Sequence, residues 1–400
     1  MCSISGANCL KLASGPLFAS AVFVVSGQGG NNDSARDLLS RYLERGNKVP
    51  LRSIVEHGFG MRTNRTMQLK IEQDGVGRFK ATVLQPLSDQ GKIIFDDGRK
   101  FMNYHPDENR LTIQDSPSLR AEDPRARMKL AALNYFFKIE KGPEIAGRRS
   151  VVVVASPRAG EMPVRRYSLE SIKSVLLRLE IELSSGERYQ LLDTKAITFL
   201  PSIPTSTFTF KPLSDVRIIE LPSPTRIDSP EQAKEALGFE PILPQALPYG
   251  FVARVTELTG KNDCPMLAVR ITDGLAYATV YQWKRDTAAE SERRWRQDGV
   301  RVGDINLRIA GDLPDTVRQR ILETFAKSSL RTNGRGQEPD LDFEALYPSR
   351  GKLGQSFDSK LDASCARQSL RDGTIVEAYD QNVAMLIEAL SLLSQTQESI

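Results

Sequence analysis

Two runs of alternating residues, joined by a glycine-bearing turn, constrain the fold of this chain more than any other feature. In residues 65–86, Met67, Leu69 and Ile71 alternate with polar residues, and the alternation resumes at Phe79 after a turn at residues 74–77. Period-two alternation predicts a β-hairpin with one apolar and one polar face. Because a lone hairpin is marginally stable in water, further strands must pair beside it. The sequence therefore predicts a larger sheet with one apolar face.

The same pattern recurs on both sides of a predicted helix. Residues 93–95 and 100–102 flank an Asp-Asp-Gly turn, and strand patterns fill residues 51–115. They return after Gly147, most clearly at residues 175–183. Ser34 and Gly46 have the residue types that begin and end a helix, and Asp123 followed by Pro124 predicts a second helix that continues to Phe137. The expected order is helix, strands, helix, strands over residues 34–212.

A chain of 400 residues exceeds what one hydrophobic core normally serves, so a second domain is expected. Residues 213–230 are rich in Pro, Ser and isolated charges, which favours a linker. Residues 231–330 then carry helix and strand patterns of a smaller α+β domain. Residues 331–400 form a polar segment followed by an amphipathic helix near the end, with Ile375 and Leu393 in its apolar pattern. The predicted fold class of the whole chain is α+β.

Charge and cysteine content exclude several classes of protein. The net charge of +4 is spread along the chain, whereas nucleic-acid binding needs a concentrated basic stripe. A short basic cluster at residues 293–296 fits a solvated helix face. The four cysteines form no C-x-x-C pair, so no zinc site or disulfide framework is indicated. Cys264 and Cys365 are compatible with a disulfide or with two free thiols.

Residues 1–30 resemble an imperfect export signal. One lysine precedes a weakly apolar run that is short for a bilayer-spanning helix, and small and polar residues follow it. We expect a cleaved signal or an N-terminal anchor, or a start codon set too early. The first two alternatives place the protein in the periplasm or another extracytoplasmic compartment.

Few residues in the sequence have the types and spacing of catalytic groups. The two histidines, His57 and His105, lie on separate predicted elements, and the nucleophile, metal and nucleotide-binding motifs are absent. The acidic pair Asp96-Asp97 precedes a glycine and is typical of a solvated turn. No residue is assigned as catalytic, cofactor-binding or metal-binding, no ligand-binding residue is identified, and no cofactor or enzymatic activity is expected.

Binding remains as the function class. A curved sheet with an apolar concave face can hold an acyl chain, since each buried CH₂ contributes about 0.8 kcal/mol. The alternative is a closed core in which helices over residues 37–44 and 127–137 fill the concavity. Both interpretations are open from the sequence.

The order of motifs resembles one known group. Four stretches of the first part of the chain are similar, in this order, to the lipoprotein-carrier (LolA) and MucB/RseB superfamily. They are the 65–86 hairpin, GKIIFDDGRKFMNYHP, the run NYFFKIEKGPEIAGRRSVVVVASP with its AGR at residues 146–148, and the hairpin LLRLEIELSSGERYQL. Three later stretches occur in the same order as similar elements of the MucB/RseB C-terminal domain. They are LPYGF at residues 247–251, TDGLAYATVYQW at 272–283 and DLPDTVRQRILETF. The resemblance covers residues 35–329.

This resemblance implies a periplasmic protein with a half-open antiparallel β-barrel, helices across its concave face, and a smaller α+β domain. MucB/RseB proteins bind the periplasmic part of a membrane-spanning anti-sigma factor, and lipid-like signals of envelope stress release them. The implied function is a non-enzymatic regulator that senses lipid or lipoprotein state. The alternative is a carrier of a lipid or lipoprotein acyl chain.

Overall fold

The computed structural model describes residues 28–58, 66–120, 123–210, 215–221, 223–261, 264–284, 299–311 and 313–332. Residues 1–27 of the predicted export signal (residues 1–30), the basic cluster at 293–296, the predicted C-terminal helix and Cys365 lie outside this part of the chain. Residues 28–30 are helical. Among the described residues, no helix combines the length and apolar character needed to cross a bilayer.

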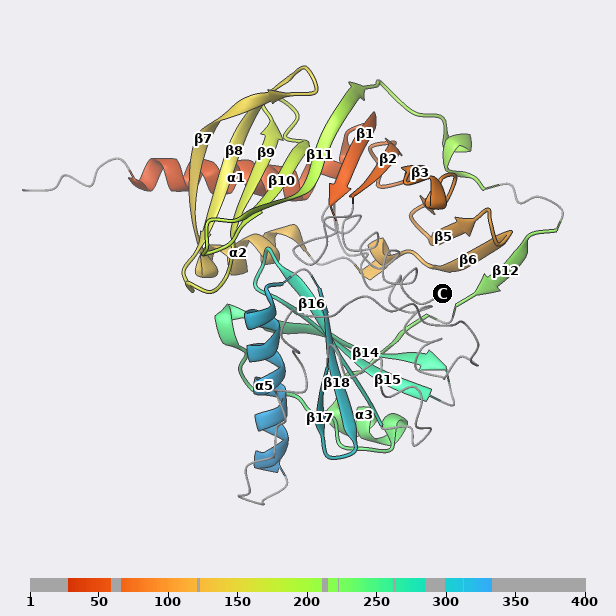
Figure 1. The fold of residues 1–400 in the computed structure, drawn as a ribbon, viewed down its shortest axis with the longest axis vertical. Helices are drawn as coiled ribbons and strands as arrows, with labels where there is room; N and C mark the ends of the chain where they lie inside the picture. The colour runs from red at the N-terminus through yellow and green to blue at the C-terminus, as the bar shows by residue number, and fades with distance from the viewer. Residues whose placement is uncertain are drawn as a thin grey trace, which may run out of the picture.

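A twelve-stranded sheet dominates the first part of the fold. Its strand order is β12-β6-β5-β4-β3-β2-β1-β11-β10-β9-β8-β7, and the two end strands, β12 and β7, do not pair with each other. All neighbouring strands are antiparallel except β12 and β6. Figure 1 shows this open sheet as an arch, with α2 and the second sheet on its inner side. The strands are β1 (Leu51–Gly58), β2 (Thr66–Gln73), β3 (Phe79–Gln85), β4 (Ile93–Asp96), β5 (Lys100–His105), β6 (Arg110–Asp115), β7 (Tyr135–Ile145), β8 (Arg148–Pro157), β9 (Val164–Glu170), β10 (Leu176–Glu182), β11 (Arg188–Phe199) and β12 (Arg217–Glu220).

The expected hairpins are confirmed. β2 pairs with β3, so that Leu69 lies across from Val83 and Ile71 from Ala81. Of the side chains predicted to face inward, Met67, Leu69, Ile71, Ala81 and Val83 are buried and Phe79 is partly buried. Lys70 and Thr82 between them are on the opposite face. One face of the β2–β3 hairpin is therefore apolar from Met67 to Val83, as the alternation requires.

Helix α1 (Gln28–Arg45) begins earlier than expected. Ser34, predicted as its N-cap, lies inside the helix, and the glycine- and asparagine-rich residues before it are helical. The side chain of Asn32 accepts a hydrogen bond from the backbone N–H of Phe137 on the edge strand β7 (3.0 Å). Packing against β7 therefore overrides the poor helix propensity of this segment.

Helix α2 (Pro124–Asn134) begins as predicted, with Asp123 accepting a hydrogen bond from the N–H of Arg125 (3.0 Å). The expectation that it continues to Phe137 is wrong. Tyr135 starts β7, where Tyr135 and Phe137 are buried and Phe136 is exposed. The aromatic alternation favours a strand, and pairing with β8 satisfies the backbone there.

A six-stranded sheet forms the second part of the fold, in the order β13-β14-β15-β16-β18-β17. Ser229 caps helix α3 by accepting a hydrogen bond from Gln232 N–H (3.2 Å), and Gly238 ends the helix with a positive φ. Helix α5 packs against β17 and β18. Its elements are β13 (Thr225–Arg226), α3 (Pro230–Leu237), β14 (Val252–Lys261), β15 (Cys264–Thr272), β16 (Tyr277–Lys284), β17 (Gly299–Val302), β18 (Ile305–Gly311) and α5 (Asp315–Thr332).

The segment interpreted as a linker contributes a strand to each sheet. β12 pairs in parallel with β6 through Arg217–Glu220, and β13 pairs with β14. The Pro- and Ser-rich composition concealed these short strands, since each is held by a neighbour distant in sequence. The linker interpretation of residues 213–230 is therefore incomplete.

Candidate functional site

The inner face of the sheet is covered differently in its two halves. Over β7–β11, α1 and α2 supply Leu39, Tyr42 and Met128 to a core shared with Val153 and Leu169. In the part of the chain that the structure describes, no helix contributes a side chain to the apolar cluster of the other half. We call that cluster the apolar strip; it consists of Val55, Met67, Leu69, Ile71, Ala81, Val83, Ile94 and Phe101.

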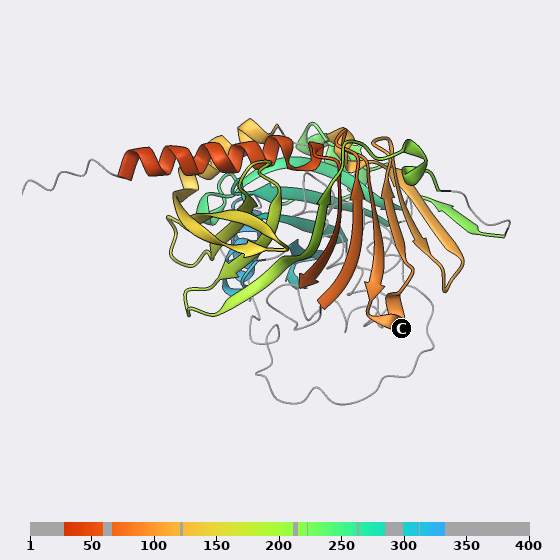
Figure 2. The same ribbon diagram turned by 90° about the horizontal axis from the view of Figure 1, so that it is seen from above.

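The apolar strip lies on the same face as the helix-covered core. His57 at the end of β1 pairs with Leu192 of β11 on one side and with Met67 of β2 on the other. Paired residues in antiparallel strands share a face, so the inner surface continues from one half to the other. The helices therefore cover one half of the arch, and the strip lies on the inner face of the other half. In Figure 2, α1 lies beside the β7–β11 half of the sheet.

Three buried polar side chains adjoin the strip. Asn103, His105 and Gln114, which we call the polar patch, are 1%, 5% and 3% exposed. Asn103 lies across from Ile94, and Gln114 across from Phe101, so the patch is on the inner face next to the strip. The amide atoms of Asn103 and Gln114 and both ring nitrogens of His105 have no hydrogen-bond partner. Burial lowers the pKa of His105 to about 4, with Arg110 and Lys92 adding to the effect.

Sequence reasoning did not identify Asn103 and Gln114. The sequence does contain a pattern that points to part of this patch. Asn103 and His105 follow Phe101 at intervals of two residues, so they occupy positions on the face of the strand that is otherwise apolar. A polar residue at such a position is either satisfied in the core or available to a ligand. Only the hydrogen-bond pattern of the folded chain separates these cases.

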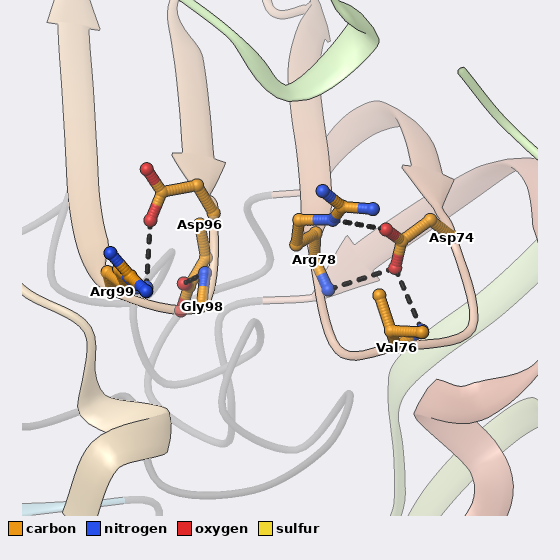
Figure 3. A network of polar contacts seen from close by, with 7 residues as sticks. Asp74, Val76, Arg78, Asp96, Gly98 and Arg99 are labelled. Carbon is orange, nitrogen blue, oxygen red and sulfur yellow. Dashed lines mark hydrogen bonds and ion pairs between the residues drawn. The ribbon is translucent and has the colours of Figure 1, made fainter. Parts of the chain in front are cut away.

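Two aspartates organise the turns at one end of the strip (Figure 3). Asp74 accepts hydrogen bonds from the N–H groups of Val76 (2.9 Å) and Arg78 (3.1 Å), and it forms an ion pair with the Arg78 side chain. Asp96 accepts from Gly98 N–H (2.7 Å) and from the Ser116 hydroxyl (2.8 Å). The expected solvated turn is therefore wrong for Asp96, which is buried, and burial raises its pKa to about 6.

The two histidines do not form a catalytic pair. β1 and β5 are separated by three strands, so the backbones of His57 and His105 are about 19 Å apart along the sheet. The Nδ1 of His57 lies 2.8 Å from the carbonyl oxygen of Leu191. Within the described ranges, no group of three or more His, Cys, Asp or Glu side chains is arranged to hold a metal ion.

The turn between β15 and β16 joins the second sheet to the first part of the fold. Asp273 accepts a hydrogen bond from the Tyr135 hydroxyl (2.6 Å), and Asn134 donates to the carbonyl oxygen of Asp273 (2.9 Å). Gly274, with φ +102°, lies so close to α2 that a Cβ there would be 2.4 Å from Ala131 N. Leu275 belongs to the core under α1 and α2. We call these contacts the junction.

The junction contains a fully buried carboxyl group. Burial raises the pKa of Asp273, while the Arg165 charge, the Tyr135 hydroxyl and the N–H groups of Leu275 and Ala276 oppose the shift. Burial also raises the pKa of Tyr135, so its hydroxyl remains a donor at neutral pH. Arg127 of α2 lies over the Tyr277 ring, 4.7 Å from its centroid. The second sheet thus rests on the helix that closes one half of the arch.

No protein-family model and no curated protein matches the sequence. Solved structures do match. A crystal structure of MucB is 14% identical with a TM-score of 0.50, over 73% of this chain and 97% of that chain. The Pseudomonas aeruginosa MucA/MucB complex matches at 13% identity with a TM-score of 0.49, over 72% of this chain and 97% of that one. The chain has the fold of MucB, which confirms at the level of the fold the resemblance seen in the motifs.

Proposed function

We propose that this chain is a non-enzymatic binding protein of the cell envelope that takes an acyl chain onto the apolar strip. The observation that carries the proposal is the strip itself: eight buried apolar side chains on the inner face of an open sheet, without a described helix among them. An acyl chain laid along such a surface gains about 0.8 kcal/mol for each CH₂ removed from water. Binding of this kind requires no catalytic group, metal or cofactor.

As a MucB/RseB-like regulator, the protein would use the half-open barrel as a lipid sensor and bind the periplasmic segment of an anti-sigma factor. The motif order and the fold of MucB support this role. The junction supplies a route for coupling, because the second sheet contacts α2 and the start of β7, next to the core that continues into the strip. A periplasmic or other extracytoplasmic location is part of the proposal.

Acyl binding is tested by titrating the full chain with a fluorescent fatty acid. Ala81 is fully buried in the strip, and Ala155 is fully buried on the same face under the helices. Ala81→Phe fills the strip and should weaken binding at least tenfold. Ala155→Phe is the matched control and should leave affinity within about twofold, with circular dichroism showing that both variants fold. Equal loss in both variants, or no binding by wild type, contradicts the proposal.

The regulatory role is tested by calorimetric titration with the periplasmic segment of a membrane-spanning anti-sigma factor from the source organism. A regulator should bind it, and saturating acyl ligand should weaken that binding. The alternative, a LolA-type carrier, shares the acyl site but should instead transfer its ligand to acceptor vesicles. Transfer without anti-sigma binding favours the carrier, and anti-sigma binding unaffected by ligand contradicts a lipid-sensing regulator.

A further inference from the structure

The polar patch differs from two other buried polar side chains on the same face, Gln73 and Asp96. Gln73 of β2 donates to the carbonyl oxygens of Gly46 (3.0 Å) and Val49 (2.8 Å), and Asp96 is paired with Ser116 and Gly98. Asn103, His105 and Gln114 are equally buried but have six side-chain atoms without a partner. Buried donors and acceptors are nearly always hydrogen-bonded in folded proteins, and leaving them unpaired costs stability. Three adjacent exceptions indicate a place where a ligand supplies the hydrogen bonds.

The position of the patch defines the shape of such a ligand. Asn103 and His105 are two residues apart on β5, so their side chains share a face about 7 Å apart. Gln114 lies on the adjacent strand β6, across from Phe101 of the strip. A molecule with its acyl chain along the strip therefore has its polar end at the patch. The ligand must be amphipathic.

The chemistry of the patch favours an uncharged head group. Each amide has two N–H donors and a carbonyl acceptor, and a neutral imidazole has one donor and one acceptor. The low pKa of His105 keeps its ring neutral at physiological pH. Together these side chains match esters, amides and hydroxyls, which both donate and accept hydrogen bonds or accept from several donors.

The charged groups around the patch disfavour an anion. The two nearby cations that influence His105 are held by carboxylates, Arg110 by Glu108 and Lys92 by Asp89. Asp96 lies across from Phe101 in the same row of residues as Gln114. A phosphate or carboxylate head group would have to leave water for a buried site and displace an existing ion pair to obtain a counter-charge, which is unfavourable.

We propose that Asn103, His105 and Gln114 bind the uncharged ester or hydroxyl head group of an acylglycerol whose chain lies on the apolar strip. This inference rests on the proposed acyl-binding function and specifies its ligand. It makes the protein a receptor for neutral lipid, with the head group selected by hydrogen bonds and the chain held by apolar contact.

The test compares three lipids with the same chain and different head groups: monopalmitoylglycerol, palmitate and palmitoyl-lysophosphatidate. Displacement of a fluorescent fatty acid from the full chain gives each affinity. Wild type should bind monopalmitoylglycerol at least tenfold more tightly than either anion. Asn103→Leu and Gln114→Leu should each reduce that preference at least threefold, while the affinity for palmitate changes less than twofold.

Thermal unfolding without lipid gives a second measurement. Because Asn103→Leu removes unpaired polar atoms, it should raise or leave unchanged the melting temperature, whereas Gln73→Leu, which breaks two formed hydrogen bonds, should lower it. Equal affinity for the three lipids, or a preference unchanged in both patch variants, overturns the head-group assignment and leaves acyl binding intact. Failure of all three lipids to bind overturns the proposed function as well.

Discussion

At the scale of the residue, the polar side chains of the inner face show how burial changes their chemistry. Asp96 and Asp97 are neighbours in one turn, but Asp96 is 2% exposed whereas Asp97 accepts hydrogen bonds from the N–H groups of Arg99 and Lys100 in an exposed setting. Desolvation raises the pKa of Asp96 to about 6 even though Gly98 and Ser116 donate to its carboxylate. Removing the negative charge should therefore stabilise the fold at neutral pH.

Asp96→Asn should make stability less dependent on pH. The folded-state pKa of about 6 lies above the ordinary value of 3.8, so the protonated carboxyl stabilises the fold below pH 3.8 and this contribution is lost as the pH rises through 6. Asn imitates the protonated form, so the variant should exceed wild type by about 3 kcal/mol at pH 8 and match it near pH 3.5. Urea unfolding at several pH values measures this. A difference independent of pH, or the same gain in Asp97→Asn, contradicts it.

At the scale of the element, α2 shows which sequence signals determine a boundary. Its start depends on local chemistry, since Asp123 caps the first turn and Pro124 occupies a position where no N–H is needed. Its end depends on the sheet, because Tyr135 leaves the helix to pair across from Pro157 at the edge. The N-terminal boundary of α2 can therefore be predicted from the sequence, whereas its C-terminal boundary cannot.

Asp123→Ala should destabilise the fold by about 1 kcal/mol, because the first turn of α2 loses a side-chain acceptor for Arg125 N–H. Asp123→Asn preserves an acceptor at the same position and should stay close to wild type. Urea unfolding at neutral pH gives both free energies. If Asp123→Asn lowers the free energy of unfolding as much as Asp123→Ala does, loss of the cap hydrogen bond does not explain the destabilisation.

At the scale of the whole molecule, the junction determines how the two sheets are joined. Its contacts involve the β15–β16 turn on one side and α2 with the start of β7 on the other. Met162, from the loop after β8, also packs in the core of the second sheet. These reciprocal contacts should make the two sheets unfold together.

Gly274→Ala should uncouple that unfolding. A Cβ at this position would be 2.4 Å from Ala131 N and 2.7 Å from the Arg127 carbonyl oxygen, so α2 and the turn must separate. Gly303 also has a positive φ (+57°) but a Cβ there meets nothing within 4 Å, so Gly303→Ala measures the backbone strain alone, about 1 kcal/mol. Calorimetry should show two separated transitions for Gly274→Ala and one for Gly303→Ala. If both variants instead show a single unfolding transition with the same shift in melting temperature, the close contact between Gly274 and α2 does not couple the two sheets.

Much of the fold is determined by the sequence alone. Alternation from Met67 to Val83 specified which side chains face inward, since a strand exposes successive residues on opposite faces. Asp123 and Ser229 specified helix starts, since their side chains bond the adjacent backbone. The order of these elements was sufficient to indicate the fold that MucB shares.

Only the tertiary structure decided the rest. The start of α1 at Gln28, the strand at Tyr135 and the pairing of β12 with β6 all depend on neighbours distant in sequence. The same holds for the site. Asn103, His105 and Gln114 are ordinary polar residues in the sequence, and their burial without partners arises only when β5 and β6 face the inside of the arch. Local patterns determine which way a side chain points, whereas long-range packing determines what it meets there.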